Sequence, residues 1–226
     1  MIPEPYKFIV NSNYKIIENK GVTDDSLKRY VDGCFNDIGR MVGLFKTWIC
    51  VKCLERGADK LELDRNYGWG DNPRKCKICH NNTYEVATFQ ARASYVGAMF
   101  EYACFHVLTT KFEVKAAISS EQTRLYDFEI KNDVVVEAKG SPEYIVNPDG
   151  SKSKLGRAGM LRTDTKKKAF ANAAEWHKRF PNGHFFIITN AIPNELRAWR
   201  DDKIDAIYDV TNANQLHKLV DELTSH

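Results

Sequence analysis

Two pairs of cysteines impose the strongest constraint on how this chain can fold. Cys50 and Cys53 form one Cys-x-x-Cys pair, Cys76 and Cys79 form a second, and 22 residues lie between the pairs. Two intervening residues allow both sulfurs of a pair to bind one ion, so four thiolates can hold Zn²⁺ tetrahedrally. Four protein ligands leave no open coordination position, so we expect one structural zinc per chain that takes no part in chemistry.

Two other interpretations of the cysteine pairs are weaker. A disulfide within a Cys-x-x-Cys pair closes too small a loop to stabilise much, and disulfides are rare inside the cell. His80 follows the last cysteine and could replace it as a ligand, although the four-cysteine set is complete without it. The other cysteines, Cys34 and Cys104, stand in apolar helical surroundings and are expected to be buried free thiols.

No segment of the sequence indicates export or a membrane span. The chain starts without a basic segment followed by an apolar run, and its most apolar stretch, residues 184–192, is far shorter than the roughly 20 residues that cross a bilayer. Hydrophobic residues make up 43% of the 226 positions and charged residues 28%, values typical of a globular protein. We therefore expect a soluble protein of the cell interior without a membrane partner.

The cysteine pairs and the apolar periodicity together divide the chain into a helical N-terminal segment over residues 1–45, a zinc ribbon over 46–82 and a core domain over 83–226. Long helices are expected at 24–45, with Asp24 as N-cap, and at 88–108. The elements expected next are strands at 112–118, 124–130 and 134–139, a loop at 141–161, a helix from 163 or 164 to 179, a strand at 184–190, a short helix at 194–200, a strand at 206–210 and a helix at 212–223. The order α-β-β-β-α-β predicts an α/β (α+β) core, a mixed central sheet flanked by helices.

The strand expected at residues 134–139 carries two charges on one face. Side chains alternate across a sheet, so Glu137 and Lys139 point the same way from an otherwise apolar strand. Burying these charges unpaired would be costly, so they need a partner nearby. The preceding strand supplies one if the hairpin turns over residues 131–133, whose Asn or Asp can take the left-handed conformation that such a turn requires.

That turn sets the pairing of the two strands. Its register pairs Ile130 with Val134, Glu129 with Val135 and Asp127 with Glu137, which brings Asp127, Glu137 and Lys139 together. A two-residue turn would send Asp127 to the other face. Glu129, on the same face as Asp127, is an alternative to it, and Asp133 is explained by the turn.

The chemistry of these three side chains indicates a metal-dependent site. Two carboxylates this close repel each other unless a cation lies between them, and hard oxygen ligands suit Mg²⁺ or Mn²⁺. Lys139, two residues after Glu137, is placed to orient and polarise a water on the metal. Such a water can attack phosphorus in line with the leaving oxygen.

The arrangement resembles the PD-(D/E)xK nuclease superfamily, which includes most type II restriction endonucleases. Asp127 matches the first acid, Glu137 the second and Lys139 the lysine, and the element order also matches that fold. The resemblance implies one or two Mg²⁺ ions per site, bound by both acids and the carbonyl of Ala138. It also implies a further carboxylate from the preceding helix, where Glu101 stands.

The match to the family signature is incomplete at one position, and other features of the chain support it. Tyr126 stands where the signature has proline, a substitution that members of the superfamily commonly tolerate. Glu-x-Lys alone occurs by chance in most proteins, so the interpretation rests on its combination with the apolar strand, the upstream acid, the element order and the following basic segment. Gly97, one turn before Glu101, is expected to let that helix approach the sheet closely.

Opposite charges separate along the core. Residues 119–150 contain seven acids and three bases, and residues 151–180 contain nine bases and two acids. Such a chain suits simultaneous binding of cations and a polyanion, although two solvated faces would give the same pattern. We expect phosphate contacts from a flexible loop that orders mainly on DNA and from the start of the next helix, where cations oppose the helix dipole. The candidates are Lys152, Lys154, Arg157, Arg162, Lys166, Lys167 and Lys168, with Asn147 among the possible base contacts.

The leading hypothesis is a type II restriction endonuclease of a bacterial or archaeal cytoplasm. It would cut double-stranded DNA at a palindromic site as a homodimer and leave 5'-phosphate and 3'-hydroxyl ends. No nucleotide cofactor is expected, because the chain has no GxxxxGK[ST] loop. The alternatives are a repair or junction-resolving nuclease of the same fold and a zinc-ribbon DNA-binding protein with an inactive core. Basic and aromatic residues around the cysteines leave open whether the ribbon contacts DNA or only braces the fold or dimer.

Overall fold

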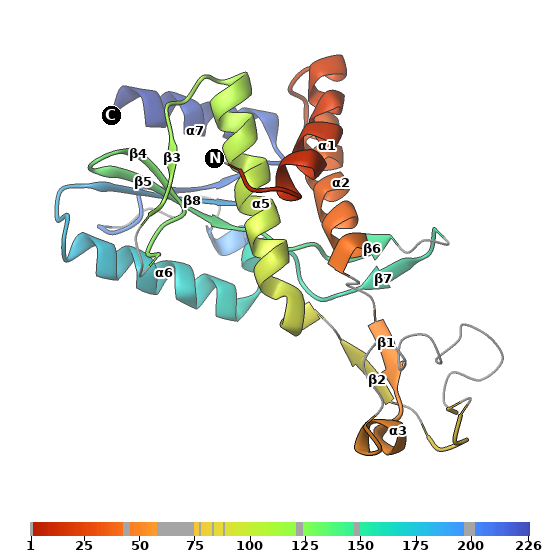
Figure 1. Cartoon of the computed structure of the whole chain (residues 1–226). Helices are drawn as coiled ribbons and strands as arrows, with labels where there is room; N and C mark the ends of the chain where they lie inside the picture. The colour runs from red at the N-terminus through yellow and green to blue at the C-terminus, as the bar shows by residue number, and fades with distance from the viewer. Residues whose placement is uncertain are drawn as a thin grey trace.

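A five-stranded mixed sheet forms the centre of the molecule (Figure 1). The computed structural model describes residues 2–42, 46–57, 75, 76, 78–82, 84–87, 89–120, 124–146, 150–196 and 202–226. The strands follow the order β3 (Ala117–Ile118), β4 (Phe128–Lys131), β5 (Val134–Lys139), β8 (His184–Thr189) and β9 (Ala206–Asp209). The pairs β3–β4 and β4–β5 are antiparallel, whereas β5–β8 and β8–β9 are parallel. The mixed sheet predicted from the sequence is confirmed.

Helices cover both faces of this sheet, as the sequence predicted. Helices α5 (Phe89–Lys111) and α7 (Ala213–Ser225) pack on one face, and α6 (Thr163–His177) packs on the other. Helices α1 (Tyr6–Lys20) and α2 (Asp24–Val42) belong to the first side and pack on α5. Figure 1 shows α6 and α7 on opposite sides of the sheet. Within the described ranges, no helix is long and apolar enough to cross a membrane.

Strand β5 is the central strand and is covered on both faces. Val134 and Val136 pack in the cluster under α5, and Val135 packs in the cluster over α6, because successive side chains alternate. All residues of β5 up to Ala138 are buried, and Lys139 at the strand end is partly exposed. The charged side chains of β5, Glu137 and Lys139, therefore lie at the C-terminal end of the strand, where burial decreases.

The four-cysteine segment forms a small module beside the helical layer (Figure 1). Strand β1 (Lys46–Ile49) pairs antiparallel with β2 (Tyr84–Ala87), and helix α3 (Val51–Glu55) follows β1. The module lies between α2 and α5 in the chain, and its buried cysteines form an apolar cluster separate from the two clusters of the sheet. Most residues between its two cysteine pairs lie outside the described residues.

The loop expected at residues 141–161 is partly folded, so that expectation was wrong. Strand β6 (Tyr144–Val146) pairs antiparallel with β7 (Lys152–Lys154), and a 3-10 helix, η1, spans Gly159–Leu161. The hairpin rests on α2: Ile145 is buried, and its Cδ1 would lie 2.8 Å from a Cβ added to Gly39. Val146 N–H donates to the side chain of Asn36 at 3.0 Å. Strands this short within a loop-like composition leave no clear periodicity in the sequence.

The N-terminus of α2 differs from the expected one. Thr23 caps the helix, because its Oγ1 accepts from Ser26 N–H while Ser26 Oγ accepts from Thr23 N–H. Asp24, the expected cap, instead accepts a hydrogen bond of 2.7 Å from Ala213 N–H at the start of α7. That partner lies 189 residues further along the chain, so sequence-local capping rules could not reveal it.

The remaining boundaries differ from the expected ones mainly in length. The strands expected at 112–118 and 124–130 are shorter, and the helix expected at 88–108 runs on to Lys111. The short helix expected at 194–200 is a 3-10 helix, η2 (Asn194–Leu196), and residues 197–200 lie outside the described part of the chain. Residues 43–45, at the end of the first expected helix, lie outside it as well.

The close approach of α5 to the sheet occurs at Gly140 and not at Gly97. A Cβ added to Gly140 would lie 2.1 Å from Cγ of Phe100, so this ring of α5 packs directly on the backbone after β5. A Cβ added to Gly97 would meet no heavy atom of the described residues within 4 Å. The expectation for Gly97 was wrong because that residue lines an open cleft.

Candidate active site and metal centre

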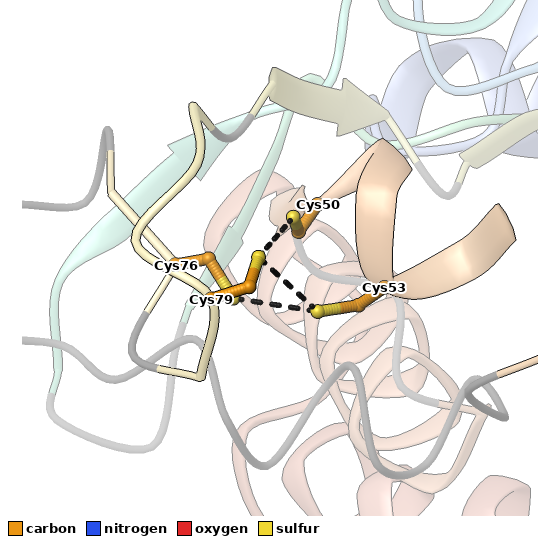
Figure 2. Close-up of side chains that lie close together, drawn as sticks. All are labelled: Cys50, Cys53, Cys76 and Cys79. Carbon is orange, nitrogen blue, oxygen red and sulfur yellow. Dashed lines mark hydrogen bonds between the residues drawn. The ribbon is translucent and has the colours of Figure 1, made fainter. Parts of the chain in front are cut away.

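The four cysteines predicted from their spacing lie together (Figure 2). The Sγ atoms of Cys50 and Cys79 are 3.4 Å apart, and Sγ of Cys53 is 3.6 Å from those of Cys76 and Cys79. All four Sγ atoms lie within 4.8 Å of one another. Zn–S bonds of about 2.3 Å in a tetrahedron place sulfurs roughly 3.8 Å apart, so the cluster has a suitable size. The group could hold a structural metal ion such as zinc.

The backbone around the second cysteine pair has the form of a tight turn. Ile78 N–H points to Sγ of Cys76 at 3.4 Å, and His80 N–H donates to the carbonyl of Cys76 at 2.9 Å. His80 is exposed and adopts a φ of 57°, which fits a residue that ends the turn. Cys34 and Cys104 are buried free thiols, as expected, and burial raises the pKa of both.

The β4–β5 hairpin has the expected pairing of Glu129 with Val135, but its turn is shorter than predicted. The turn contains only Asn132 and Asp133, neither of which has a positive φ, and Lys131 pairs with Val134 in place of Ile130. A bulge between Glu129 and Lys131 compensates for the shorter turn. Glu129 still faces Val135, and Phe128 faces Val136. Asp127 therefore stays on the predicted side of the hairpin.

Asp127 lies just before β4 and is held by the end of β5. Its Oδ2 accepts a hydrogen bond of 2.8 Å from Ala138 N–H and lies 3.7 Å from Nζ of Lys139. Its Oδ1 lies 3.6 Å from Nη2 of Arg124. The carboxylate is 9% exposed and lies between two cationic side chains.

Glu137 and Lys139 form a buried ion pair at the end of β5. Nζ of Lys139 contacts Oε1 of Glu137 and lies 3.3 Å from the carbonyl oxygen of Ala138. Burial and then Asp127 raise the pKa of Glu137, although Lys139 and Asn172 act in the opposite direction. Burial lowers the pKa of Lys139, but Glu137 and Asp127 outweigh it and leave the pKa raised. Oε2 of Glu137 is buried without a hydrogen-bond partner among the described residues.

Glu101 reaches the same place from α5. Both of its carboxylate oxygens contact Nη2 of Arg124, at 2.7 and 2.8 Å. Burial, followed by the charge of Asp127, raises the pKa of Glu101 to about 7, and Arg124 opposes this shift. The structure thus brings all four predicted catalytic residues to one end of β5, with Arg124 linking Glu101 to Asp127.

Glu101, Arg124, Asp127 and Lys139 lie at a cleft that is open to solvent, whereas Glu137 is buried and is not part of its lining. Its lining includes Glu101, Arg124, Asp127, Ala138, Lys139, Arg162 and Lys168. Among the described residues, the four cysteines are the one group of three or more Cys, His, Asp or Glu whose ligand atoms are close enough to share an ion. At the cleft, the ammonium of Lys139 and the guanidinium of Arg124 lie between the carboxylates.

Two residues of this site were missed from the sequence. Asn172 donates to Oε1 of Glu137 at 2.9 Å, and it interrupts the apolar stripe of Ala169, Ala173 and Trp176 on α6, a signal that the sequence did contain. Arg124 gave no such signal, because nothing in the sequence around it indicates a contact with Glu101, which stands 23 residues earlier on α5.

Glu129, the alternative to Asp127, faces a different cleft. It accepts a hydrogen bond of 3.4 Å from Tyr126 Oη and lines a depression with Thr109, Lys115 and Asn132. The structure therefore does not bring Glu129 to the other acids.

The predicted DNA-contacting cations divide into two groups. Arg162 and Lys168 line the carboxylate cleft, whereas Lys154, Arg157 and Lys166 line a neighbouring cleft. Ion pairs join Lys154 to Glu143 and Lys166 to Glu195, both at 3.4 Å. Lys152 on β7 and Lys167 on α6 are exposed, and Asn147 lies outside the described residues.

Comparison of the chain with protein-family models, with curated proteins and with solved structures gives no match. The functional assignment therefore depends on the residues and geometry described above.

Proposed function

We propose that this protein is a Mg²⁺-dependent endonuclease of the PD-(D/E)xK type, a type II restriction endonuclease that cuts duplex DNA at a palindromic site as a homodimer. One observation carries the proposal. Nζ of Lys139 lies among three oxygen atoms, those of Glu137 Oε1, Asp127 Oδ2 and the Ala138 carbonyl. These are the oxygens that the resemblance assigns to the metal.

Three oxygens around one cationic atom define a position that favours positive charge. Carboxylate and carbonyl oxygens are the ligands that Mg²⁺ prefers, and Oε2 of Glu137, which has no hydrogen-bond partner among the described residues, offers a further one. The residues therefore fit a divalent ion, provided that Lys139 withdraws toward the cleft. Lys139 has that freedom, because its side chain is 22% exposed at the end of the strand.

A bound Mg²⁺ would supply an acidified water and would neutralise charge that develops on the phosphate. The residues of the chain would perform the other tasks. Asp127 and Glu137 would hold the ion, and Ala138 N–H keeps Asp127 oriented through its 2.8 Å hydrogen bond. Lys139, once displaced toward the cleft, would orient the attacking water and offset part of the charge of the phosphate. The products are 5'-phosphate and 3'-hydroxyl ends.

The order of the elements supports the same assignment. Helix α5, strands β3, β4 and β5, helix α6 and strand β8 follow one another as the resemblance leads us to expect, with the β6–β7 hairpin added after β5. Cations gather around this cleft and the neighbouring one from the residues that flank η1, from α6 and from the hairpin, where the phosphates of a bound duplex would lie. We infer that these cations contact the DNA backbone.

One observation favours a DNA-binding protein with an inactive core as the second candidate. Lys139 and Arg124 already neutralise the carboxylates, so a metal ion must compete with them. Plasmid digestion with and without Mg²⁺ separates the two candidates. Discrete bands indicate cleavage at specific sites, a smear indicates a non-specific nuclease, and uncut plasmid favours the binding protein.

The catalytic assignment is tested by substitution in the same assay. Lys139→Ala and Asp127→Ala should each lower the cleavage rate by at least about 100-fold, while duplex binding persists. Lys131→Ala is the matched control, because Lys131 is an exposed lysine at the turn end of the same hairpin. Cleavage at wild-type rate by either active-site variant would rule out the site.

A further inference from the structure

Arg124 holds two carboxylates that the proposed reaction would need. Its Nη2 contacts both oxygens of Glu101, at 2.7 and 2.8 Å, and lies 3.6 Å from Oδ1 of Asp127. The side chains of Glu101 and Asp127 are 6% and 13% exposed, whereas that of Arg124 is 50% exposed. The guanidinium thus covers two shielded acids from the solvent side of the cleft.

The backbone of Arg124 is held in an unfavourable conformation. Its φ is 41°, in the left-handed region that residues with a Cβ rarely adopt. Such strain persists where the surroundings impose it, and it is concentrated at active sites and ligand clamps. Arg124 thus makes its contact with Glu101 from a strained backbone position.

Asp127 lies between two cationic positions of different depth. Lys139, whose side chain is 22% exposed, approaches Oδ2 from the end of β5, and the more exposed Arg124 approaches Oδ1 from the solvent side of the cleft. A guanidinium is less strongly hydrated than an ammonium and binds carboxylate and phosphate through the same planar set of donors. Arg124 can therefore exchange the acids for a phosphate without losing its pairing.

We propose that Arg124 is a counter-ion that occupies a second cation position, between Glu101 and Asp127, and that it transfers to a DNA phosphate when a divalent ion enters that position. The inference rests on the proposed nuclease function, since it assigns Arg124 the placement of the substrate strand. Metal entry and phosphate binding then favour each other. A divalent ion releases the guanidinium, and the phosphate keeps the guanidinium away from the acids.

The first test measures Mn²⁺ binding without DNA, by titration calorimetry of the zinc-loaded protein. Arg124→Met should lower the Kd for Mn²⁺ at least about fivefold, because it removes the competing cation. Arg162→Met is the matched control: it removes an arginine that lines the same cleft but is paired with Asp164, and it should change the Kd less than twofold. An unchanged or higher Kd in Arg124→Met, or no Mn²⁺ binding by either protein, would overturn the proposal.

The second test measures duplex binding with and without Ca²⁺, a hard divalent ion that takes the same oxygen ligands as Mg²⁺. Arg124→Met should weaken binding about tenfold with Ca²⁺ and less than twofold without it. With Ca²⁺, the slope of log K against log salt should also fall by about one, because one phosphate contact is lost. An equal loss in both conditions would contradict the exchange. Neither test requires cleavage. Uncut plasmid with the expected binding shifts would refute the nuclease function alone, and cleaved plasmid with an unchanged Mn²⁺ Kd would refute the role of Arg124 alone.

Discussion

Glu101 shows how burial and charge act on a single residue of the cleft. Its pKa is raised to about 7, first by burial and then by Asp127, whereas a glutamate in the unfolded chain titrates near pH 4.3. The folded protein therefore keeps a proton that the unfolded chain has lost between these pH values. That proton stabilises the folded state at low pH, and the stabilisation is lost as pH rises through the folded pKa.

The consequence is a pH-dependent difference between wild type and Glu101→Gln. Without divalent ions, we predict that the unfolding free energy of wild type falls relative to this variant by up to about 3 kcal/mol between pH 4.5 and pH 8. Urea unfolding across this range measures the difference. The exposed Glu18→Gln variant is the control and should follow wild type. Parallel curves for wild type and Glu101→Gln would show that Glu101 is not shielded in solution.

Asn172 is the other residue whose surroundings lead to a prediction. Its Nδ2 donates to Oε1 of Glu137, a carboxylate that is 1% exposed and whose second oxygen lacks a partner among the described residues. Asn172→Ala should lower the unfolding free energy by about 1–3 kcal/mol, because it removes a donor from a buried acid. Denaturant unfolding measures this change. Asn11→Ala, at an exposed position of α1, should stay within about 0.5 kcal/mol of wild type, and an equal effect of both would contradict the assigned hydrogen bond.

At the scale of elements, the β6–β7 hairpin is a preformed ribbon beside the cleft. Its inner face rests on α2 through Ile145, while Tyr144 is exposed and Nζ of Lys154 lies 5.7 Å from the centre of its ring. Tyr144 and Lys154 form a directly opposed pair, as do Val146 and Lys152, so these side chains share the outer face. A two-stranded ribbon of this kind fits the major groove of a duplex.

Replacing both lysines of the ribbon, in Lys152→Ala/Lys154→Ala, should weaken duplex binding without changing the melting temperature. The slope of log K against log salt should fall by about two, because two phosphate contacts are lost. Lys28→Ala/Lys218→Ala removes the same charge from α2 and α7 and is the control. Fluorescence anisotropy at several salt concentrations measures both slopes. Equal slopes for the two variants would exclude the hairpin from the DNA contact.

The sequence predicted those elements whose determinants are local. Strand β5 has its predicted bounds because an uninterrupted apolar run, Val134 to Val136, specifies a buried strand, and the four cysteines followed from spacing alone. The β4–β5 turn was mispredicted in detail, since the sequence does not reveal that a bulge would compensate for a shorter turn. Arg124 was missed because its partner is Glu101, a contact that only the packing of α5 creates.

At the scale of the whole molecule, α5 connects the cysteine module to the cleft. The helix starts directly after the segment that carries β2, and its part up to Glu101 contributes Ser94, Gly97 and Glu101 to the cleft lining. The second half packs in the core of the sheet through Cys104, Val107 and Leu108. A metal ion held by the module would therefore influence the cleft through one continuous helix, while the sheet would keep its own apolar clusters.

This arrangement predicts separable effects of losing the metal. Cys76→Ser should reduce bound zinc from about one ion per chain to almost none by elemental analysis, because binding and folding of such modules are one process. The sheet should persist, with most of the far-UV circular dichroism retained, since its clusters do not include the cysteine module. DNA cleavage should fall because the first turns of α5 lose their anchor.

Cys104→Ser, at a buried thiol outside the module, is the control and should keep its zinc. Zinc retained by Cys76→Ser would contradict the ligand assignment, and loss of the whole circular dichroism signal would contradict the independence of the sheet.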